Sequence, residues 1–393
     1  DAKRVPGGCQ EGATTNHMSD TGSPFGPILD DPSVAELADA LDANGRIVCE
    51  GAVGSSTVVL ASAVARRTGR PVMLVLAHLD EAESALDELA LLGTDAVRLP
   101  AMEVLPGESS AAPDLLAERI AAVRRVLAIR AGEAPVIVAP IHALMQTVPR
   151  PEQIDRLTLR LGEGDRFQPE RLIEWLGSAG YDRRDAIEEP GEFSVRGGIV
   201  DVFPAGGDSV APLRIDFFGD EIDRINEIDL DTMGSDRRVQ AFEAVAARLE
   251  PNLADEGTSF LRLVPDDASA LVAETLEVTE QGRGYFERVT DSRGVFGPPA
   301  VFKTLRERFR GFAEVNQFSV PHASDTRVTC PVRSLPAFSQ ETSEAFAELA
   351  ELGSDGRRLV LSCENEGEAS RCGELLDEFA PDLGASVAVL IGY

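Results

Sequence analysis

A glycine-rich turn is the first feature of this sequence that could carry out chemistry. The apolar pattern predicts a short strand just before the turn and a helix just after it. Backbone N–H groups in such a turn, together with the helix N-terminus, can bind phosphate. A phosphate loop starting at Gly51 would need Gly at 56, Lys at 57 and Ser or Thr at 58. The chain has Ser56, Thr57 and Val58, so it lacks the lysine for the β- and γ-phosphates and the hydroxyl for Mg²⁺.

The lysine content of the chain makes this departure sharper. Lys3 and Lys303 are the only lysines, and Lys3 belongs to a polar N-terminal tail. ATP hydrolysis at the turn is therefore not expected, and we interpret it as a structural turn kept in an inactive nucleotide fold. Binding of phosphate or another anion by the backbone N–H groups stays open. The residues of this degenerate phosphate loop are Gly51, Gly54, Ser55, Ser56 and Thr57.

The net charge restricts the class of partner. The 393 residues include 67 acidic and 37 basic side chains, a formal net charge of −30. Such a field repels nucleic acid backbones and anionic membranes. We see no transmembrane run and no signal peptide. The cysteines are scattered and the histidines isolated, which predicts neither disulfides nor a metal site. A reduced cytoplasmic protein without membrane association is the prediction.

The elements around the turn predict more than one domain. From Ile28, strands alternate with helices as in a parallel sheet covered on both faces. Beyond Pro149, short strands separated by Gly and Pro predict a small antiparallel domain. The pattern is mixed again from Ser235 and includes a predicted helix at 237–249. A new strand–helix–strand unit follows near the C-terminus.

The predicted fold class is therefore α/β. It comprises a P-loop-like parallel α/β domain without a working phosphate loop, an inserted small β-rich α+β domain, and a truncated further α/β unit. The chain begins with Asp1 and ends directly after an apolar run, which predicts a piece of a longer protein. The predicted segments are a disordered tail at 1–27, the α/β domain at 28–147, the small domain at 148–232, a mixed continuation of the first domain at 233–331, and the further α/β unit at 332–393.

The small predicted domain contains a distinctive string. It consists of Pro190-Gly-Glu-Phe193, Val195-Arg-Gly-Gly198, Asp201-Val-Phe-Pro204 and Phe217-Phe-Gly-Asp-Glu221. This string resembles the module shared by the transcription-repair coupling factor family (Mfd) and the excision-repair protein UvrB. The resemblance covers essentially residues 28–393. UvrB has a working phosphate loop, whereas this chain has Thr57 at the position of its lysine, so the resemblance favours the coupling factor.

The resemblance implies a division of labour. The UvrB-like N-terminal module of this family recruits UvrA for nucleotide excision repair at stalled RNA polymerase. RNA polymerase and DNA are contacted by a C-terminal part that contains an ATP-driven translocase. We therefore expect UvrA as the partner of this chain. A small-molecule ligand is not expected. No cofactor is expected here, and ATP and Mg²⁺ are expected only in the C-terminal motor.

Four residues of the small domain are candidates for the UvrA contact. The resemblance matches Arg183 and Arg196 to arginines that face UvrA, and guanidinium groups suit bidentate contacts with carboxylates. Phe193 and Phe203 could be apolar anchors beside them. A different reading puts Phe203 and Phe217 in the core of the sheet. A different reading of Arg196 pairs it with one of the glutamates at 188, 189 and 192.

Two other functions stay in competition with the adaptor. One is a UvrB-like ATP-dependent excision-repair component, which would need the loop lysine and two complete motor lobes. The other is a diverged α/β protein that binds a nucleotide at the old phosphate loop. Whether this chain is itself an enzyme stays open, and the absence of a lysine in the loop argues against enzymatic activity.

Overall fold

The structure is a computed structural model that describes residues 25–29, 31–43, 45–102, 113–206, 211–230, 232, 234–248, 256–318 and 326–391. One compact unit comprises residues 32–336, and a second contains residues 337–391. Residues 1–24 of the predicted tail lie outside the described residues. The short helix α1 (Gly26–Leu29) includes the last two residues of that predicted tail.

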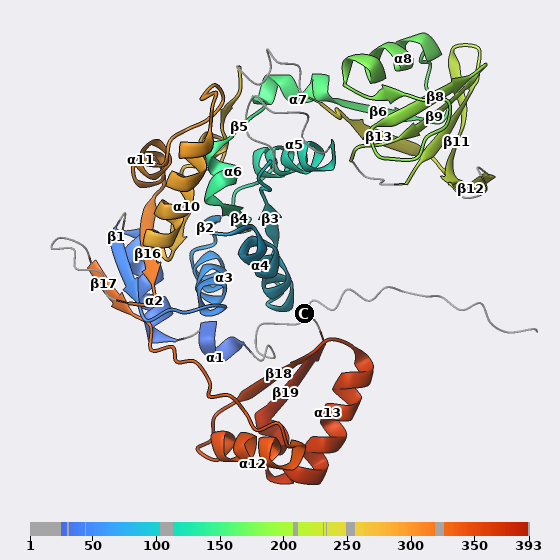
Figure 1. Ribbon diagram of the computed structural model, residues 1–393. Helices are drawn as coiled ribbons and strands as arrows, with labels where there is room; N and C mark the ends of the chain where they lie inside the picture. Colours follow the sequence, from blue (N-terminus) through green and yellow to red (C-terminus); the bar gives the residue numbers. More distant parts are fainter. Residues whose placement is uncertain are drawn as a thin grey trace, which may run out of the picture. The chain divides into compact units, whose positions relative to one another are not determined.

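A seven-stranded parallel sheet forms the centre of the larger unit (Figure 1), in the order β17-β1-β16-β15-β2-β4-β3. Every residue of β2 and β15 is buried, as expected for strands covered on both faces. The mixed α/β class with a parallel sheet is therefore confirmed. The strands are β1 (Arg46–Glu50), β2 (Val72–Leu76), β3 (Ala96–Arg98), β4 (Val136–Pro140), β15 (Ser269–Ala273), β16 (Gly311–Asn316) and β17 (Thr326–Thr329).

Amphipathic helices pack against this sheet. The first long helix shows the pattern, because its residues at helical spacing, Val34, Leu37, Ala38 and Leu41, are buried. The helix after β1 ends at Gly69, whose left-handed conformation terminates it. The helices of this part are α2 (Pro32–Asp42), α3 (Ser56–Thr68), α4 (Leu79–Leu91), α5 (Pro113–Leu127), α6 (Ile141–Met145), α10 (Thr275–Arg288) and α11 (Pro298–Arg308).

The chain leaves the parallel sheet after β4 and returns to it with β15, and the segment between them forms a six-stranded sheet. Its order is β12-β11-β10-β9-β8-β7, with β7 and β8 parallel and the other neighbours antiparallel. Its strands are β7 (Asp182–Arg183), β8 (Glu192–Arg196), β9 (Ile199–Phe203), β10 (Leu213–Phe218), β11 (Glu221–Asp229) and β12 (Gly234–Val239).

Shorter elements flank this sheet. Strand β13 (Ala241–Val245) pairs with β6 (Thr158–Gly162), and β14 (Thr258–Ser259) pairs with β5 (Thr147–Val148). The remaining elements of the segment are α7 (Pro151–Leu157), α8 (Pro169–Ser178) and the 3₁₀ turn η1 (Phe260–Arg262). Leu172 and Leu176 of α8 share one hydrophobic core with Phe193, Val200 and Val202, so α8 covers that face of the sheet.

The helix predicted at 237–249 is wrong. This segment holds the end of β12 and all of β13. Its alanines favour a helix locally, but pairing with β11 and β6 supplies its backbone hydrogen bonds instead. Strand β12 thus continues the six-stranded sheet beyond the predicted domain boundary at residue 232.

The second unit contains a parallel pair of strands joined by a helix. Strand β18 (Leu359–Cys363) pairs with β19 (Val387–Ile391). The helices are α12 (Thr342–Gly353) and α13 (Glu366–Phe379), and the 3₁₀ segment η2 (Pro381–Ser386) precedes β19. A small core of Leu349, Ala380 and Leu383 lies between them.

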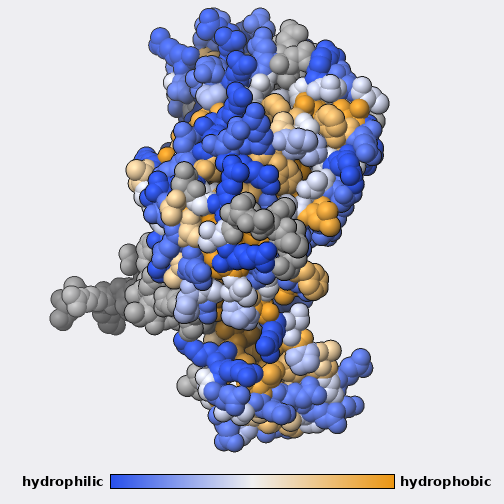
Figure 2. Space-filling view, turned by 90° about the vertical axis from the view of Figure 1, so that its left-hand side faces the viewer, coloured by the Kyte–Doolittle hydropathy of each residue, from blue (hydrophilic) through white to orange (hydrophobic). Residues whose placement is uncertain are grey.

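One face of the described surface is mainly polar. Figure 2 shows one face on which hydrophilic residues predominate and hydrophobic residues occur in small groups between them. Scattered exposed apolar side chains are normal for folded proteins. Among the described residues, no helix is both long and apolar enough to cross a membrane.

Candidate partner-binding site

The edge of the six-stranded sheet carries the arginines predicted to bind a partner. Strand β7 lies at this edge, with Asp182 opposite Glu192 and Arg183 opposite Phe193. Strands β8 and β9 are joined by a two-residue turn. Its first residue, Gly197, has a φ of +62°, which glycine adopts without steric cost. This tight turn places Arg196 at the end of the hairpin.

The two arginines lie on opposite sides of the sheet edge. Side chains alternate along a strand, so Arg183 projects on the side of Phe193 and Arg196 on the side of Glu192. Arg183 is exposed and makes no side-chain hydrogen bond or ion pair with any residue that the structure describes. Arg196 is also exposed, and its Nη2 donates to the carbonyl of Asp185 at 2.8 Å. A partner that contacts both must therefore reach around the edge.

The alternative reading of Arg196 as an ion pair with a nearby glutamate is not what the structure contains. Arg196 bonds to a backbone carbonyl, and Glu192 is paired with Arg184 instead. The charge of Arg196 is therefore not neutralised by any of the three glutamates considered, at 188, 189 and 192.

The two phenylalanines have different environments. Phe193 is 3% exposed and belongs to the main hydrophobic core. The prediction of Phe193 as a surface anchor is therefore corrected, because its position opposite Val202 directs it under α8. Phe203 lies opposite Glu192, on the other side of the sheet, and is half-buried. It is the one of the two phenylalanines that keeps surface for a partner.

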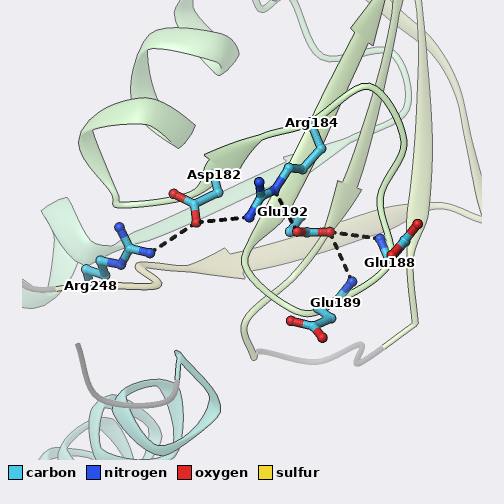
Figure 3. Close-up of polar contacts among 6 residues, drawn as sticks. All are labelled: Asp182, Arg184, Glu188, Glu189, Glu192 and Arg248. Carbon is cyan, nitrogen blue, oxygen red and sulfur yellow. Dashed lines mark hydrogen bonds and ion pairs between the residues drawn. The ribbon is translucent and has the colours of Figure 1, made fainter. Parts of the chain in front are cut away.

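Beside these arginines, alternating charges form a network along the sheet edge (Figure 3). Arg248 donates to Asp182, with Nη2 3.1 Å from Oδ2. Asp182 also lies 3.8 Å from the guanidinium of Arg184. The Nε of Arg184 donates to Oε1 of Glu192 at 2.9 Å. The carboxylates thus engage Arg184 and Arg248, whereas Arg183 stays available.

The second carboxylate oxygen of Glu192 binds the backbone of the preceding loop. Oε2 accepts from the N–H groups of Glu188 at 2.8 Å and Glu189 at 3.1 Å. Partial burial alone would raise the pKa of Glu192. The two N–H groups and the Arg184 guanidinium outweigh burial and hold this pKa below its ordinary value. Glu192 is therefore a charged residue at neutral pH, with both oxygens engaged.

Sequence reasoning missed this network. Arg248 is 66 residues from Asp182, so no local spacing links them. The only available signal was the run of alternating acidic and basic residues around Arg184, which has no unique pairing on its own. The structure resolves the pairing because β7 lies next to β8 and Arg248, three residues after the end of β13, meets the same edge.

The degenerate phosphate loop forms the predicted strand–turn–helix. Gly51 has a φ of +86°, and a Cβ there would lie 2.4 Å from the carbonyl oxygen of Cys330, so this position requires glycine. The side chain of Ser56 is bonded to its own turn, since Val53 N–H donates to its Oγ and Oγ donates to the Val53 carbonyl, each at 2.7 Å. Thr57, where a phosphate loop has lysine, is 7% exposed.

Carboxylates line the space in front of this turn. A cavity of about 270 Å³ is bounded by the turn and by the side chains of Asp80, Glu81, Glu88 and Glu274. The hydroxyl of Ser55 donates to Oε1 of Glu88 at 2.7 Å, and burial raises the pKa of Glu88. Negative charge thus surrounds the place where phosphate would bind, which disfavours an anion. No cluster suited to a metal ion occurs within the described ranges.

Comparison with known proteins identifies the segment around the sheet edge. Residues 159–249 match the family model of the UvrB interaction domain. The match runs from β6 past β13 and includes the whole network of Figure 3. It also includes Arg183 and Arg196.

Larger relatives match about half of the chain. The transcription-repair-coupling factor of Bacillus subtilis is 34% identical over 188 residues, 47% of this chain and 16% of that protein. The corresponding protein of Escherichia coli is 30% identical over 200 residues, 50% of this chain and 17% of that protein. The matches thus span less than a fifth of these relatives. The recognition from sequence is confirmed: this chain resembles the N-terminal portion of transcription-repair-coupling factors and contains a UvrB interaction domain.

Proposed function

We propose that this chain is the N-terminal docking module of a transcription-repair-coupling factor and recruits UvrA for nucleotide excision repair. The match of residues 159–249 to the UvrB interaction domain supports this proposal, because in the family that module faces UvrA. The observation that carries it is the exposed guanidinium of Arg183, which has no partner among the described residues. Exposed arginines of this kind are enriched at the centres of protein interfaces.

The docking surface consists of Arg183, Arg196 and Phe203. Arg183 and Arg196 offer planar donors for carboxylates, and Phe203 offers partly exposed apolar area between charged neighbours. The rest of the chain is strongly acidic, so this edge is a local site for an acidic surface of UvrA. Electrostatic complementarity of this kind speeds association and fixes the register of two partners.

Charge reversal at Arg196 tests the proposal. We expect Arg196→Glu to weaken UvrA binding by about 2–4 kcal/mol, the range for reversing a charge at an interface hot spot. Isothermal titration calorimetry with purified UvrA measures this. Arg283→Glu is the matched control, because Arg283 is an exposed arginine on α10, outside residues 159–249. Unchanged binding by Arg196→Glu and Arg183→Glu together would reject this surface.

We place the remaining functions implied by the resemblance outside the matched residues. We propose that RNA polymerase, DNA, and ATP with Mg²⁺ are bound by the remaining length of the full protein, in the cytoplasm. A UvrB-like ATPase is disfavoured for this chain, because Thr57 replaces the phosphate-loop lysine and four carboxylates line the cavity. On the same grounds, the turn is the remnant of a P-loop-like fold that no longer holds a nucleotide.

A further inference from the structure

Glu192 connects its own strand, β8, with Arg184 and with the loop 185–190. One oxygen accepts from the Arg184 guanidinium at 2.9 Å, and the other accepts from two backbone N–H groups of the loop 185–190. Its side chain is only 13% exposed, against 55% for Arg184. A carboxylate offers about four acceptor positions, and here at least three are used. No neutral side chain of similar size can accept from all three donors in this geometry.

The loop that Glu192 holds also holds Arg196. The Nη2 of Arg196 donates to the carbonyl of Asp185, the first residue of the loop. Glu192 fixes the other end of the loop through Glu188 and Glu189. The position of the Asp185 carbonyl, and with it the direction of the Arg196 guanidinium, thus depends on how the loop is anchored.

Glu192 also keeps the charge at the edge in a defined arrangement. Glu192 forms an ion pair with Arg184, and Asp182 forms an ion pair with Arg248. Without Glu192, Arg184 would keep only its 3.8 Å contact with Asp182, a carboxylate that is shared with Arg248. A free long side chain there costs conformational entropy when a partner orders it. The network therefore leaves only the interface arginines open to a partner.

We infer that Glu192 is a positioning residue of the docking edge, which orders the loop 185–190 and aims Arg196 before the partner arrives. This inference rests on the proposed function, because it concerns the same surface. Glu192 itself touches no partner. It contributes to affinity by lowering the ordering cost of the loop, as pre-organised interfaces do.

A matched pair of carboxylates allows a sharp test. Glu192→Ala removes both acceptor oxygens. Glu227→Ala does the same on β11, next to the far edge strand β12, where Glu227 is 16% exposed and paired with Arg237. Arg184→Ala removes the ion pair and leaves the loop N–H bonds in place. Trp175, the only tryptophan, reports by its fluorescence that each variant's small domain is folded.

Two measurements on the full chain are combined. We expect Glu192→Ala to weaken UvrA binding about ten-fold, and Glu227→Ala to bind as the unchanged chain does. Hydrogen exchange of the free chain should be faster at the amides of Glu188 and Glu189 in Glu192→Ala, but not in Arg184→Ala. The effects of Glu192→Ala and Arg196→Glu should be non-additive, since one acts through the other.

The outcomes separate the inference from the proposed function. Wild-type affinity in Glu192→Ala, with reduced affinity in Arg196→Glu, would keep the docking site and overturn the positioning role. Weaker binding with unchanged amide exchange would also overturn it, because Glu192 would then act by another route. If Arg183→Glu and Arg196→Glu bind UvrA normally, the docking surface itself is wrong, and the role of Glu192 falls with it.

Discussion

The guanidinium of Arg214 contacts the carboxylate of Asp201 at two points, with Nε 2.7 Å from Oδ1 and Nη2 2.8 Å from Oδ2. The two residues are opposite each other on β10 and β9. Asp201 is 2% exposed, and the side chain of Arg214 is 20% exposed. This pair lies on the same face of the sheet as Glu192 and Arg196, and it joins the two central strands of the sheet.

We predict that Asp201→Asn destabilises the small domain by about 3 kcal/mol. The substitution replaces a charged acceptor that bonds Arg214 at two points with a neutral amide at a buried position. Urea unfolding followed by the fluorescence of Trp175 measures the change, because Trp175 lies on α8 against this sheet. Asp223→Asn is the control, since Asp223 is exposed on β11 and its charge is solvated. Equal stability of the two variants would contradict the prediction.

The parallel sheet and the glycine turn between β1 and α3 could be predicted from local patterns. Buried strands such as β2 are continuous apolar runs, and the turn at Gly51 needs a residue that tolerates positive φ. Both are properties of a few adjacent residues. The same holds for the exposure of Arg183 and Arg196, which follow from a short edge strand and a tight hairpin turn.

The remaining features depend on contacts between distant residues. The segment 237–249 has helical propensity, but two neighbouring strands pair with it. Phe193 is buried because α8 covers its face of the sheet, which the sequence of β8 alone does not specify. Arg119 is 2% exposed and donates to the carbonyls of Pro100 and Thr147. Burial lowers its pKa to about 10, so it is a buried cation, and no spacing in the sequence indicates this.

We predict that His78 and His142 titrate on opposite sides of pH 6.5. The hydrogen bond from His78 to Glu277, 2.8 Å between Nε2 and Oε1, raises the pKa of His78. Burial lowers the pKa of His142, which the hydrogen bond to the Gln281 carbonyl only partly offsets. The raised pKa means that the His78 pair stabilises the fold below pH 6.5, and this contribution is lost as pH rises through the folded pKa. For His142 the sign is opposite, and stability is lost as pH falls below 6.5.

Proton NMR titration of the histidine ring signals measures both values. Glu277→Gln should return the pKa of His78 towards 6.5 and change the pKa of His142 much less, because His78 is the smallest of the influences on His142. The effect on folding stability should be below about 1 kcal/mol, because His78 and Glu277 are 36% and 48% exposed and the pair is screened by solvent. A pKa of His78 below that of His142 would contradict the assignment of these contacts.

We predict no saturable binding of ATP with Mg²⁺ at ATP concentrations up to about 1 mM. A Kd at that limit would correspond to a binding free energy of about −4 kcal/mol. A triphosphate at the turn would meet the carboxylates of Asp80, Glu81, Glu88 and Glu274, and the turn itself contains no lysine to neutralise it. The hydroxyl of Ser55 is already bonded to Glu88, so a main donor of the turn is occupied. Amide NMR shifts measure binding directly. Saturable shifts centred on Ser55 and Thr57 would restore the nucleotide-binding alternative, whereas weak shifts spread over the surface would reflect non-specific contact.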